Sequence, residues 1–196
     1  MKIGVLALQG AFREHVKLLE SLGADAPLVK RDFHLEGLDG LVIPGGESTT
    51  IGRLLREYNL MEPIRERASQ GFPLFGTCAG MIVLANQIEG AEEPHLAVMN
   101  MKVNRNSFGR QRESFEADLE IPVIGSEPFP AVFIRAPHVV EVGEHVEVLC
   151  CYNDRMVAVQ EGNLLALSFH PELTGDARLH RHFLTMVESA QVSSAK

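Results

Sequence analysis

Apolar runs and helical repeats alternate along the first half of the chain. Residues 2–8 form a continuous apolar run, as expected of a parallel strand that is covered on both faces. The next apolar residues recur at helical spacing, at Phe12, Val16, Leu19 and Leu22. Gly23 is well placed to end that helix, and residues 26–29 and 40–43 predict a second strand and a stronger third strand. Strands that alternate with helices imply right-handed βαβ units and a parallel sheet.

The third strand leads into a glycine-rich turn and two helices. Residues 44–50 read Pro-Gly-Gly-Glu-Ser-Thr-Thr, and Ser48 or Thr49 is expected to cap the helix that follows. A second helix is predicted over residues 62–70. It leads to a short apolar run at residues 72–75, which reads as the end of a buried strand.

Beyond about residue 90 the pattern changes to short runs rich in Val, Ile and Phe. Gly, Pro and Asn interrupt these runs, so they predict strands and hairpins, some of them antiparallel. The runs cover residues 98–103, 115–121, 131–135, 139–142, 146–152 and 155–160. Residues 104–112, which contain three arginines, read as an exposed loop. Residues 164–169 predict another buried strand, and an amphipathic helix from about 176 to 189 precedes a short polar tail that is expected to fray.

Nothing in this pattern divides the chain. No shift in composition and no linker is present, so residues 1–196 are expected to form a single domain of the α/β class. A chain of 196 residues is long enough to bury a core without disulfides or metals. Its apolar content of 45% and charged content of 22% are ordinary for a soluble globular protein.

Composition and charge exclude several kinds of function. No apolar run approaches the ~20 residues that cross a bilayer, and the N-terminus lacks the apolar segment and cleavage site of a signal peptide. Three cysteines, two of them adjacent, do not make a disulfide framework, which favours a reducing, cytoplasmic location. The formal net charge of −8 argues against a nucleic-acid partner, because phosphate binding needs a concentrated basic face.

A cysteine between two glycines lies where a predicted strand meets a predicted helix. The sequence Gly-Thr-Cys-Ala-Gly at residues 76–80 has the form of a nucleophile elbow with a thiol in place of the hydroxyl, and residues 81–86 predict a buried helix after it. Unpaired N–H groups at a helix N-terminus stabilise a thiolate. A buried structural cysteine beside a glycine turn is the alternative, and the motif alone does not decide between the two.

Two further motifs follow predicted strands. Pro-Gly-Gly at residues 44–46 can aim a backbone N–H at a developing oxyanion, and a plain turn is the alternative. His170-Pro171-Glu172 follows the strand at residues 164–169. In an extended chain residues i and i+2 share a face, so Glu172 can orient the imidazole of His170 as the third group of a nucleophile–base–orienter triad. A His-Pro turn with a surface glutamate is the alternative.

These three motifs, in this order, resemble those of the class I glutamine amidotransferases over essentially the whole chain. The sequence is more similar still to the glutaminase subunits of pyridoxal 5′-phosphate synthase. That similarity lies in residues 3–10, Phe12, His15, and residues 44–50, 75–80, 104–111 and 133–137. The resemblance implies a three-layer fold with a mostly parallel central sheet and added antiparallel strands. It also implies hydrolysis of L-glutamine to L-glutamate and ammonia, without a cofactor.

The family's motifs, carried over to this chain, imply roles for individual residues. Cys78 is the nucleophile, His170 is the general base and acid, and Glu172 orients His170. The glutamine site comprises Gly46, Glu47, Ser48, Arg105, Ile134 and Arg135. The backbone N–H groups of Gly46 and Ala79 stabilise the oxyanion. A γ-glutamyl thioester forms as ammonia leaves, and water activated by His170 then releases glutamate.

The same resemblance implies a partner chain. The glutaminase fold is expected to consume all 196 residues, which leaves nothing to use the ammonia. A separate synthase must therefore dock over the site, and in the family this is a TIM-barrel subunit that builds pyridoxal phosphate. Docking is expected on the face that carries Cys78 and the segment Gln9-Gly10. The Gly45–Gly46 peptide is expected to move on docking and complete the oxyanion hole, because glycines reorient at low cost.

Three alternatives stay open at this point. The first is a glutaminase that supplies another nitrogen pathway, such as histidine or anthranilate synthesis. The second is a non-catalytic regulatory subunit of the same fold, which would have no need of a complete triad. The third is a cysteine hydrolase or a related thiol protein, which the Pro-Gly-Gly-Glu-Ser and His-Pro-Glu motifs disfavour. At least one of Cys150 and Cys151 is expected in the core, and the lack of ligand spacing around them argues against a metal.

Overall fold

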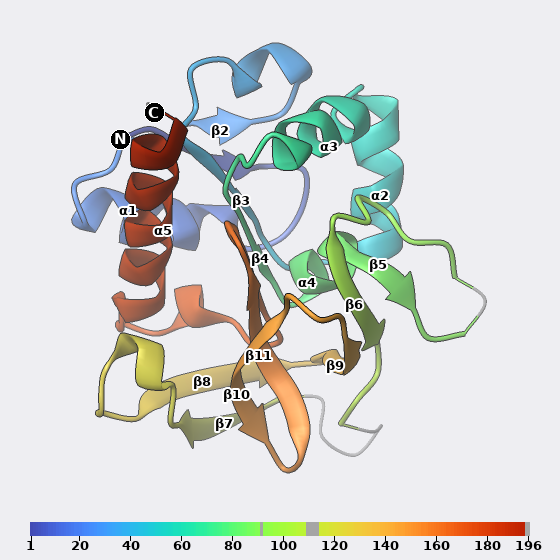
Figure 1. Ribbon diagram of the computed structural model, residues 1–196, viewed down its shortest axis with the longest axis vertical. Helices are drawn as coiled ribbons and strands as arrows, with labels where there is room; N and C mark the ends of the chain where they lie inside the picture. Colours follow the sequence, from blue (N-terminus) through green and yellow to red (C-terminus); the bar gives the residue numbers. More distant parts are fainter. Residues whose placement is uncertain (91, 109–113, 195–196) are drawn as a thin grey trace.

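The computed structural model describes residues 1–90, 92–108 and 114–194 (Figure 1). Within these residues ten strands form one sheet, and one half of that sheet is parallel. The parallel strands, in spatial order, are β2 (Leu28–Val29), β1 (Ile3–Leu6), β3 (Gly40–Ile43), β4 (Leu74–Thr77) and β12 (Leu164–Leu167). All of these except β2 are buried along their whole length, which explains their continuous apolar sequences.

The other half of the sheet is largely antiparallel. Its strands are β11 (Arg155–Glu161), β9 (His138–Val142), β6 (Met99–Asn104) and β5 (Ala85–Ile88), with β10 (Glu147–Tyr152) paired to β11. β5 and β6 run parallel to each other. A separate antiparallel pair consists of β7 (Ser114–Leu119) and β8 (Phe129–Ile134). The predicted change to strands and hairpins beyond residue 90 is therefore confirmed.

Helices cover both faces of the parallel half (Figure 1). α1 (Phe12–Ser21) and α5 (Arg178–Ser194) lie on one face, and α2 (Ser48–Glu57), α3 (Met61–Ser69) and α4 (Ala79–Leu84) lie on the other. Successive strand residues enter two separate cores: Val5 and Phe75 pack with α1 and α5, whereas Leu41 and Ile43 pack with the other three helices. Within the described ranges no helix is long and apolar enough to cross a membrane. The predicted three-layer α/β fold is confirmed.

Short 3₁₀ turns connect several of these elements, namely η1 (Asp32–Leu35), η2 (Pro122–Ile124) and η3 (Pro171–Leu173). Two helices end at other residues than predicted. The helix predicted over residues 81–86 ends at Leu84, and Ala85 instead begins β5, where it pairs with Met99 of β6. A short apolar run does not distinguish a buried helix from a buried strand, and pairing with β6 decides the outcome here. The last helix, predicted to end at about residue 189, continues to Ser194.

The strand order brings distant parts of the chain to one edge of the sheet. β12 is the last strand in the sequence, yet it lies between β4 and β11 in the middle of the sheet. The loops that follow β1, β3, β4 and β12 all leave from the same end, because these strands are parallel. Those loops carry Gln9, Gly46, Cys78 and His170, respectively.

Candidate active site

Cys78 occupies the turn between β4 and α4 in a strained backbone conformation. Its φ of 52° and ψ of −111° suit glycine better than a residue with a side chain. The N–H of Cys78 donates to the Leu167 carbonyl oxygen at 2.8 Å and so fixes the turn to β12. A Cβ at Gly76 would lie 2.5 Å from the Gly80 carbonyl oxygen, and a Cβ at Gly80 would lie 2.1 Å from that of Ile43. The two glycines are therefore needed because neighbouring backbone approaches so closely.

His170 and Glu172 lie in a short helical turn beyond β12. His170 is the N-cap of η3, and its Nδ1 lies 2.6 Å from Glu172 Oε1. The two side chains meet as predicted, but through a 3₁₀ turn rather than through extended chain. The N–H of His170 donates to the Val132 carbonyl oxygen at 2.8 Å, which joins this turn to β8. Both residues are buried, with exposed fractions of 8% and 4%.

The charges around His170 favour its protonated form. Burial on its own lowers the pKa of His170, but contacts with Cys78 and Glu172 outweigh burial and raise the pKa to about 10. The carboxylate of Glu172 is completely buried, so water does not screen its attraction to the imidazolium. The arrangement therefore suits a resting state in which His170 is an imidazolium.

Cys78 and His170 face a cavity of about 510 Å³. A cavity of this size is large enough to hold an amino acid. All the residues predicted for the glutamine site line it, as does Ala79: Gly46, Glu47, Ser48, Arg105, Ile134 and Arg135. The sulfur of Cys78 lies 3.6 Å from the Ile134 carbonyl oxygen. The sequence motifs thus identified residues that the fold brings to one cavity.

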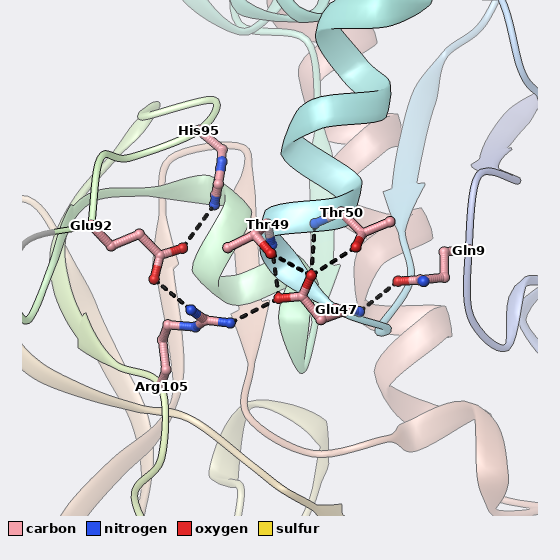
Figure 2. Close-up of polar contacts among 7 residues, drawn as sticks. All are labelled: Gln9, Glu47, Thr49, Thr50, Glu92, His95 and Arg105. Carbon is pink, nitrogen blue, oxygen red and sulfur yellow. Dashed lines mark hydrogen bonds and ion pairs between the residues drawn. The ribbon is translucent and has the colours of Figure 1, made fainter.

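Glu47 caps helix α2 and lies at the centre of a polar network (Figure 2). Its carboxylate accepts hydrogen bonds from the backbone N–H groups of Thr49 at 3.1 Å and Thr50 at 2.8 Å, and from both hydroxyl groups. The prediction that Ser48 or Thr49 caps this helix is therefore wrong. Because a carboxylate can accept several hydrogen bonds, Glu47 satisfies two N–H groups that the helix leaves free. Partial burial raises the pKa of Glu47, but the hydrogen bonds from Thr49 and Thr50 prevail and lower it to about 2.

Arg105 lies between two carboxylates at the edge of this network. Its Nη2 donates to Glu47 Oε1 at 2.9 Å, and its Nη1 donates to Glu92 Oε2 at 2.6 Å (Figure 2). The other oxygen of Glu92 lies 3.4 Å from Nε2 of His95. No sequence motif marks Glu92, yet it fixes the orientation of Arg105. Residues 109–112 of the predicted loop lie outside the described part of the chain.

The two predicted oxyanion donors lie in the turns after β3 and β4. Ala79 is the first residue of α4, where an N–H has no partner within the helix. Gly46 has a φ of +144°, and a Cβ there would lie 2.6 Å from Gln9 Oε1. The same oxygen of Gln9 accepts the N–H of Glu47 at 2.6 Å (Figure 2). Gln9 therefore holds the peptide that follows Gly46, a contact between two loops that no local pattern could predict.

The remaining cysteines lie on β10. Cys150 is buried, Cys151 is exposed, and all three cysteines of the chain are free. The prediction that at least one of the pair belongs to the core is confirmed. Burial raises the pKa of Cys150 to about 11, which disfavours its thiolate. Across the part of the chain that the structure describes, no three His, Cys, Asp or Glu side chains are arranged to hold a metal ion.

Known sequences match nearly the whole chain. The model of the SNO glutamine amidotransferase family matches residues 5–189. A protein of Geobacillus kaustophilus named pyridoxal 5′-phosphate synthase subunit PdxT is 60% identical over 195 residues, which cover 100% of this chain and 99% of the relative. The PdxT subunit of Moorella thermoacetica is 57% identical over 187 residues, which cover 95% of this chain and 100% of the relative.

Solved structures share the fold. A crystal structure of a glutamine amidotransferase has a TM-score of 0.90 at 54% identity and covers 95% of this chain and 98% of that one. The structure of PurLQS from Thermotoga maritima has a TM-score of 0.69 at 18% identity over 100% of this chain and 99% of that one, a likeness in fold alone. Because the family model and the relatives above 50% identity span nearly all of the sequence, this chain belongs to the SNO glutamine amidotransferase family.

Proposed function

We propose that the chain hydrolyses L-glutamine to L-glutamate and ammonia as the glutaminase subunit of a pyridoxal 5′-phosphate synthase. The observation that carries this conclusion is the convergence of Cys78, His170 and Glu172 beside one cavity, in a chain whose relatives are named PdxT. Residues 1–196 act as one glutaminase domain, and the mechanism below uses neither a cofactor nor a metal.

Cys78 is the nucleophile of the first step. Its thiolate attacks the side-chain amide carbon of glutamine, and the carbonyl oxygen becomes a tetrahedral oxyanion. The N–H groups of Gly46 and Ala79 stabilise that oxyanion. His170 then gives its proton to the leaving nitrogen, so that ammonia departs and a γ-glutamyl thioester remains. A His170 pKa of about 10 supports this role, because the imidazolium is then present at neutral pH.

His170 acts as a base in the second step. The neutral imidazole takes a proton from water as the water attacks the thioester. Collapse of the second tetrahedral intermediate breaks the carbon–sulfur bond, releases glutamate and restores the thiolate beside the imidazolium. Glu172 keeps the imidazole aligned and stabilises its positive charge in both steps.

Charged groups at the cavity suit the two charges on the α-carbon of glutamine. Arg105 and Arg135 supply guanidinium groups for the α-carboxylate, which guanidinium binds in a two-pronged geometry. The carboxylate of Glu47 lies against Arg105 and suits the α-ammonium group. Three further residues complete the substrate site: Gly46, Ser48 and Ile134.

The ammonia passes to a partner, a TIM-barrel synthase subunit that builds pyridoxal phosphate. Ammonia released into bulk water would be protonated and lost as a nucleophile, so the partner covers the face that carries Cys78 and Gln9-Gly10. Docking reorients the Gly45–Gly46 peptide and completes the oxyanion hole. A Gly46→Pro complex as active as the wild type would contradict this, because proline fixes φ near −65° whereas Gly46 has +144°. Free cysteines suit a reducing cytoplasm, where we place the complex.

The test is glutamate release from glutamine by the purified chain, alone and with the synthase subunit. Cys78→Ala is compared with Cys151→Ala, which removes an exposed thiol. Release that rises with the synthase, vanishes in Cys78→Ala and persists in Cys151→Ala is the expected result. Release that needs Cys78 but ignores the synthase would keep the glutaminase and overturn the pathway. No release under any condition would favour a non-catalytic regulatory subunit.

A further inference from the structure

A buried polar cluster surrounds the second carboxylate oxygen of Glu172. Its members come from four elements: His15 of α1, Thr77 of β4, Glu172 of η3 and His180 of α5. His15 Nε2 lies 3.5 Å from Glu172 Oε2 and 3.2 Å from Thr77 Oγ1. On the other side of the ring, His15 Nδ1 lies 2.8 Å from His180 Nε2. Both histidines have an exposed fraction of 0%, in a core position that is normally apolar.

Both histidines of the cluster are neutral. Burial lowers the pKa of His180 to about 4. Burial, together with the nearby His180 and His170, lowers the pKa of His15 well below its usual value. A neutral imidazole carries one N–H donor and one acceptor nitrogen. The 2.8 Å contact therefore joins an N–H of one ring to the lone pair of the other.

The surroundings select the direction of this hydrogen bond. If His15 donated through Nδ1, its bare Nε2 would face the Glu172 carboxylate, and the Nδ1–H of His180 would be buried without an acceptor among the described residues. If His180 donates through Nε2, only a lone pair on His180 remains unpaired, and the Nε2–H of His15 lies between Thr77 Oγ1 at 3.2 Å and Glu172 Oε2 at 3.5 Å. The second arrangement avoids both an orphaned donor and a repulsive contact, so it is the favoured one.

The two oxygens of Glu172 differ in their partners. Oε1 lies 2.6 Å from His170 Nδ1, whereas Oε2 is buried without a hydrogen-bond partner among the described residues and has His15 Nε2 at 3.5 Å. We infer that His15, oriented by His180, is a positioning residue that contacts Oε2 and keeps the Glu172 carboxylate aligned with His170. This role rests on the proposed glutaminase function and adds a second layer behind the triad.

A carboxylate with a polar contact at each oxygen is hindered from rotating away from His170. Without the His15 N–H, the Glu172 carboxylate would be freer to rotate away from His170. The His170 imidazolium would then be less stabilised, so the alkaline limb of the kcat/KM profile, where His170 loses its proton, should move to lower pH. The KM for glutamine should change little, because His15 does not line the cavity.

Two substitutions of His15 separate the hydrogen-bond donor from the ring. His15→Gln keeps an amide N–H near the position of Nε2, whereas His15→Leu keeps bulk without a donor. His180→Phe leaves His15 in place without its orienting donor and retains a ring against Phe75, whose centroid lies 5.5 Å away. His182→Leu is the matched control, because His182 is a half-buried histidine on the same helix as His180 that takes no part in the cluster.

The measurements are kcat, KM and the pH profile of glutamate release by the complex with the synthase subunit, and the titration of His170 by NMR in the chain alone. We expect His15→Leu to lower kcat roughly tenfold or more, as misalignment of a catalytic group does. Its alkaline limb and its His170 titration should both move to lower pH. His15→Gln should recover most of the wild-type behaviour, His180→Phe should be intermediate, and His182→Leu should match the wild type.

A folded His15→Leu chain with a wild-type alkaline limb and His170 titration would overturn the positioning role, whatever its kcat. If His15→Leu does not fold, the alkaline limb and the His170 titration are measured in His180→Phe instead. Wild-type values of both in His180→Phe would overturn the positioning role. Failure of the proposed glutaminase function can be distinguished from failure of the positioning role. A wild-type complex without Cys78-dependent glutamate release contradicts the glutaminase, while the His170 titration in the free chain still tests the positioning.

Discussion

Cys78 combines a reactive side chain with a backbone conformation that side chains disfavour. The φ of 52° is held in place by the hydrogen bond to β12 and by the close approach of neighbouring backbone at Gly76 and Gly80. Strain of this kind costs about 1–3 kcal/mol, which the surrounding structure must offset. The thiol is thus presented to the cavity at the expense of stability.

We expect Cys78→Gly to be more stable than Cys78→Ala by about 1 kcal/mol. Glycine adopts these dihedral angles without strain, which raises the free energy of unfolding. The greater conformational freedom of glycine in the unfolded chain offsets part of this increase. Both variants lack the thiol, so the difference between their free energies of unfolding in urea reports the effect of the backbone conformation. An alanine variant as stable as the glycine variant would show that this turn is not strained.

Burial of His180 should make the protein sensitive to acid. The pKa is about 4 in the folded chain against an ordinary value of 6.5, so between these pH values the unfolded state binds a proton that the folded state does not. Stability therefore falls as the pH falls through this window, by an amount on the order of 3 kcal/mol at its lower end. In urea unfolding at several pH values, His180→Phe should flatten this dependence. The exposed His145→Phe should leave it unchanged, and equal slopes in all three proteins would contradict a neutral buried His180.

Helix α2 begins at a residue that also borders the cavity. The carboxylate of Glu47 accepts the first free N–H groups of the helix and pairs with Arg105. One side chain therefore fixes both the start of an element and the edge of the candidate substrate site. This dual use explains why a glutamate replaces the shorter caps that are common elsewhere.

Glu47→Ala should lower stability by about 1 kcal/mol through loss of the cap. It should also release one side of Arg105 and raise the KM for glutamine more than it lowers kcat. Glu57→Ala is the control, because it removes the same negative charge at the exposed C-terminal end of the same helix. The helix dipole disfavours a negative charge there, so the stability of Glu57→Ala should be unchanged or slightly higher than that of the wild type. Thermal unfolding and steady-state kinetics of both variants provide the comparison. A wild-type KM in Glu47→Ala would exclude its role at the substrate.

Local chemistry predicted the elements and residues that depend on it. Apolar runs identified the buried strands, and motifs at strand ends identified Cys78 and His170. Contacts between distant segments left no such pattern: His15 and His180 are 165 residues apart in sequence. Glu92 was missed because nothing in its own loop marks a partner for Arg105, and β5 was missed because an apolar run does not reveal the strand with which it pairs.

At the scale of the whole molecule, aromatic packing joins the β7–β8 pair to the main sheet. Phe133 of β8 lies within 6 Å, between ring centroids, of four aromatic rings: Phe108 at 5.5 Å, Phe115 at 4.7 Å, Tyr152 at 5.6 Å and Phe169 at 5.4 Å. The neighbours of Phe133 along β8 contact the site. Val132 accepts the N–H of His170, and the carbonyl of Ile134 lies near the Cys78 sulfur. Packing on one face of β8 thus supports the candidate active site.

Phe133→Ala should cost about 3–5 kcal/mol of stability, because it empties a completely buried ring position. Glutamate release should fall as well, at temperatures where the variant is still folded, because β8 would no longer hold its contacts to the site. Phe33→Ala, at a ring that is 62% exposed, should change neither quantity much. Thermal unfolding gives the stability of each variant, and glutamate release is assayed well below the unfolding midpoint. Full activity in folded Phe133→Ala would contradict the idea that β8 supports the candidate active site.

The central position of β12 has a consequence for the order in which the protein is made. β1, β3 and β4 leave the ribosome first, and β4 keeps an open edge until residues 164–167 have been added between it and β11. His170 follows directly after that strand. A nascent chain therefore carries the Cys78 thiol for much of translation without the histidine that lies beside it in the folded protein. Under the proposed mechanism, glutamine hydrolysis therefore begins only after β12 has taken its place beside β4.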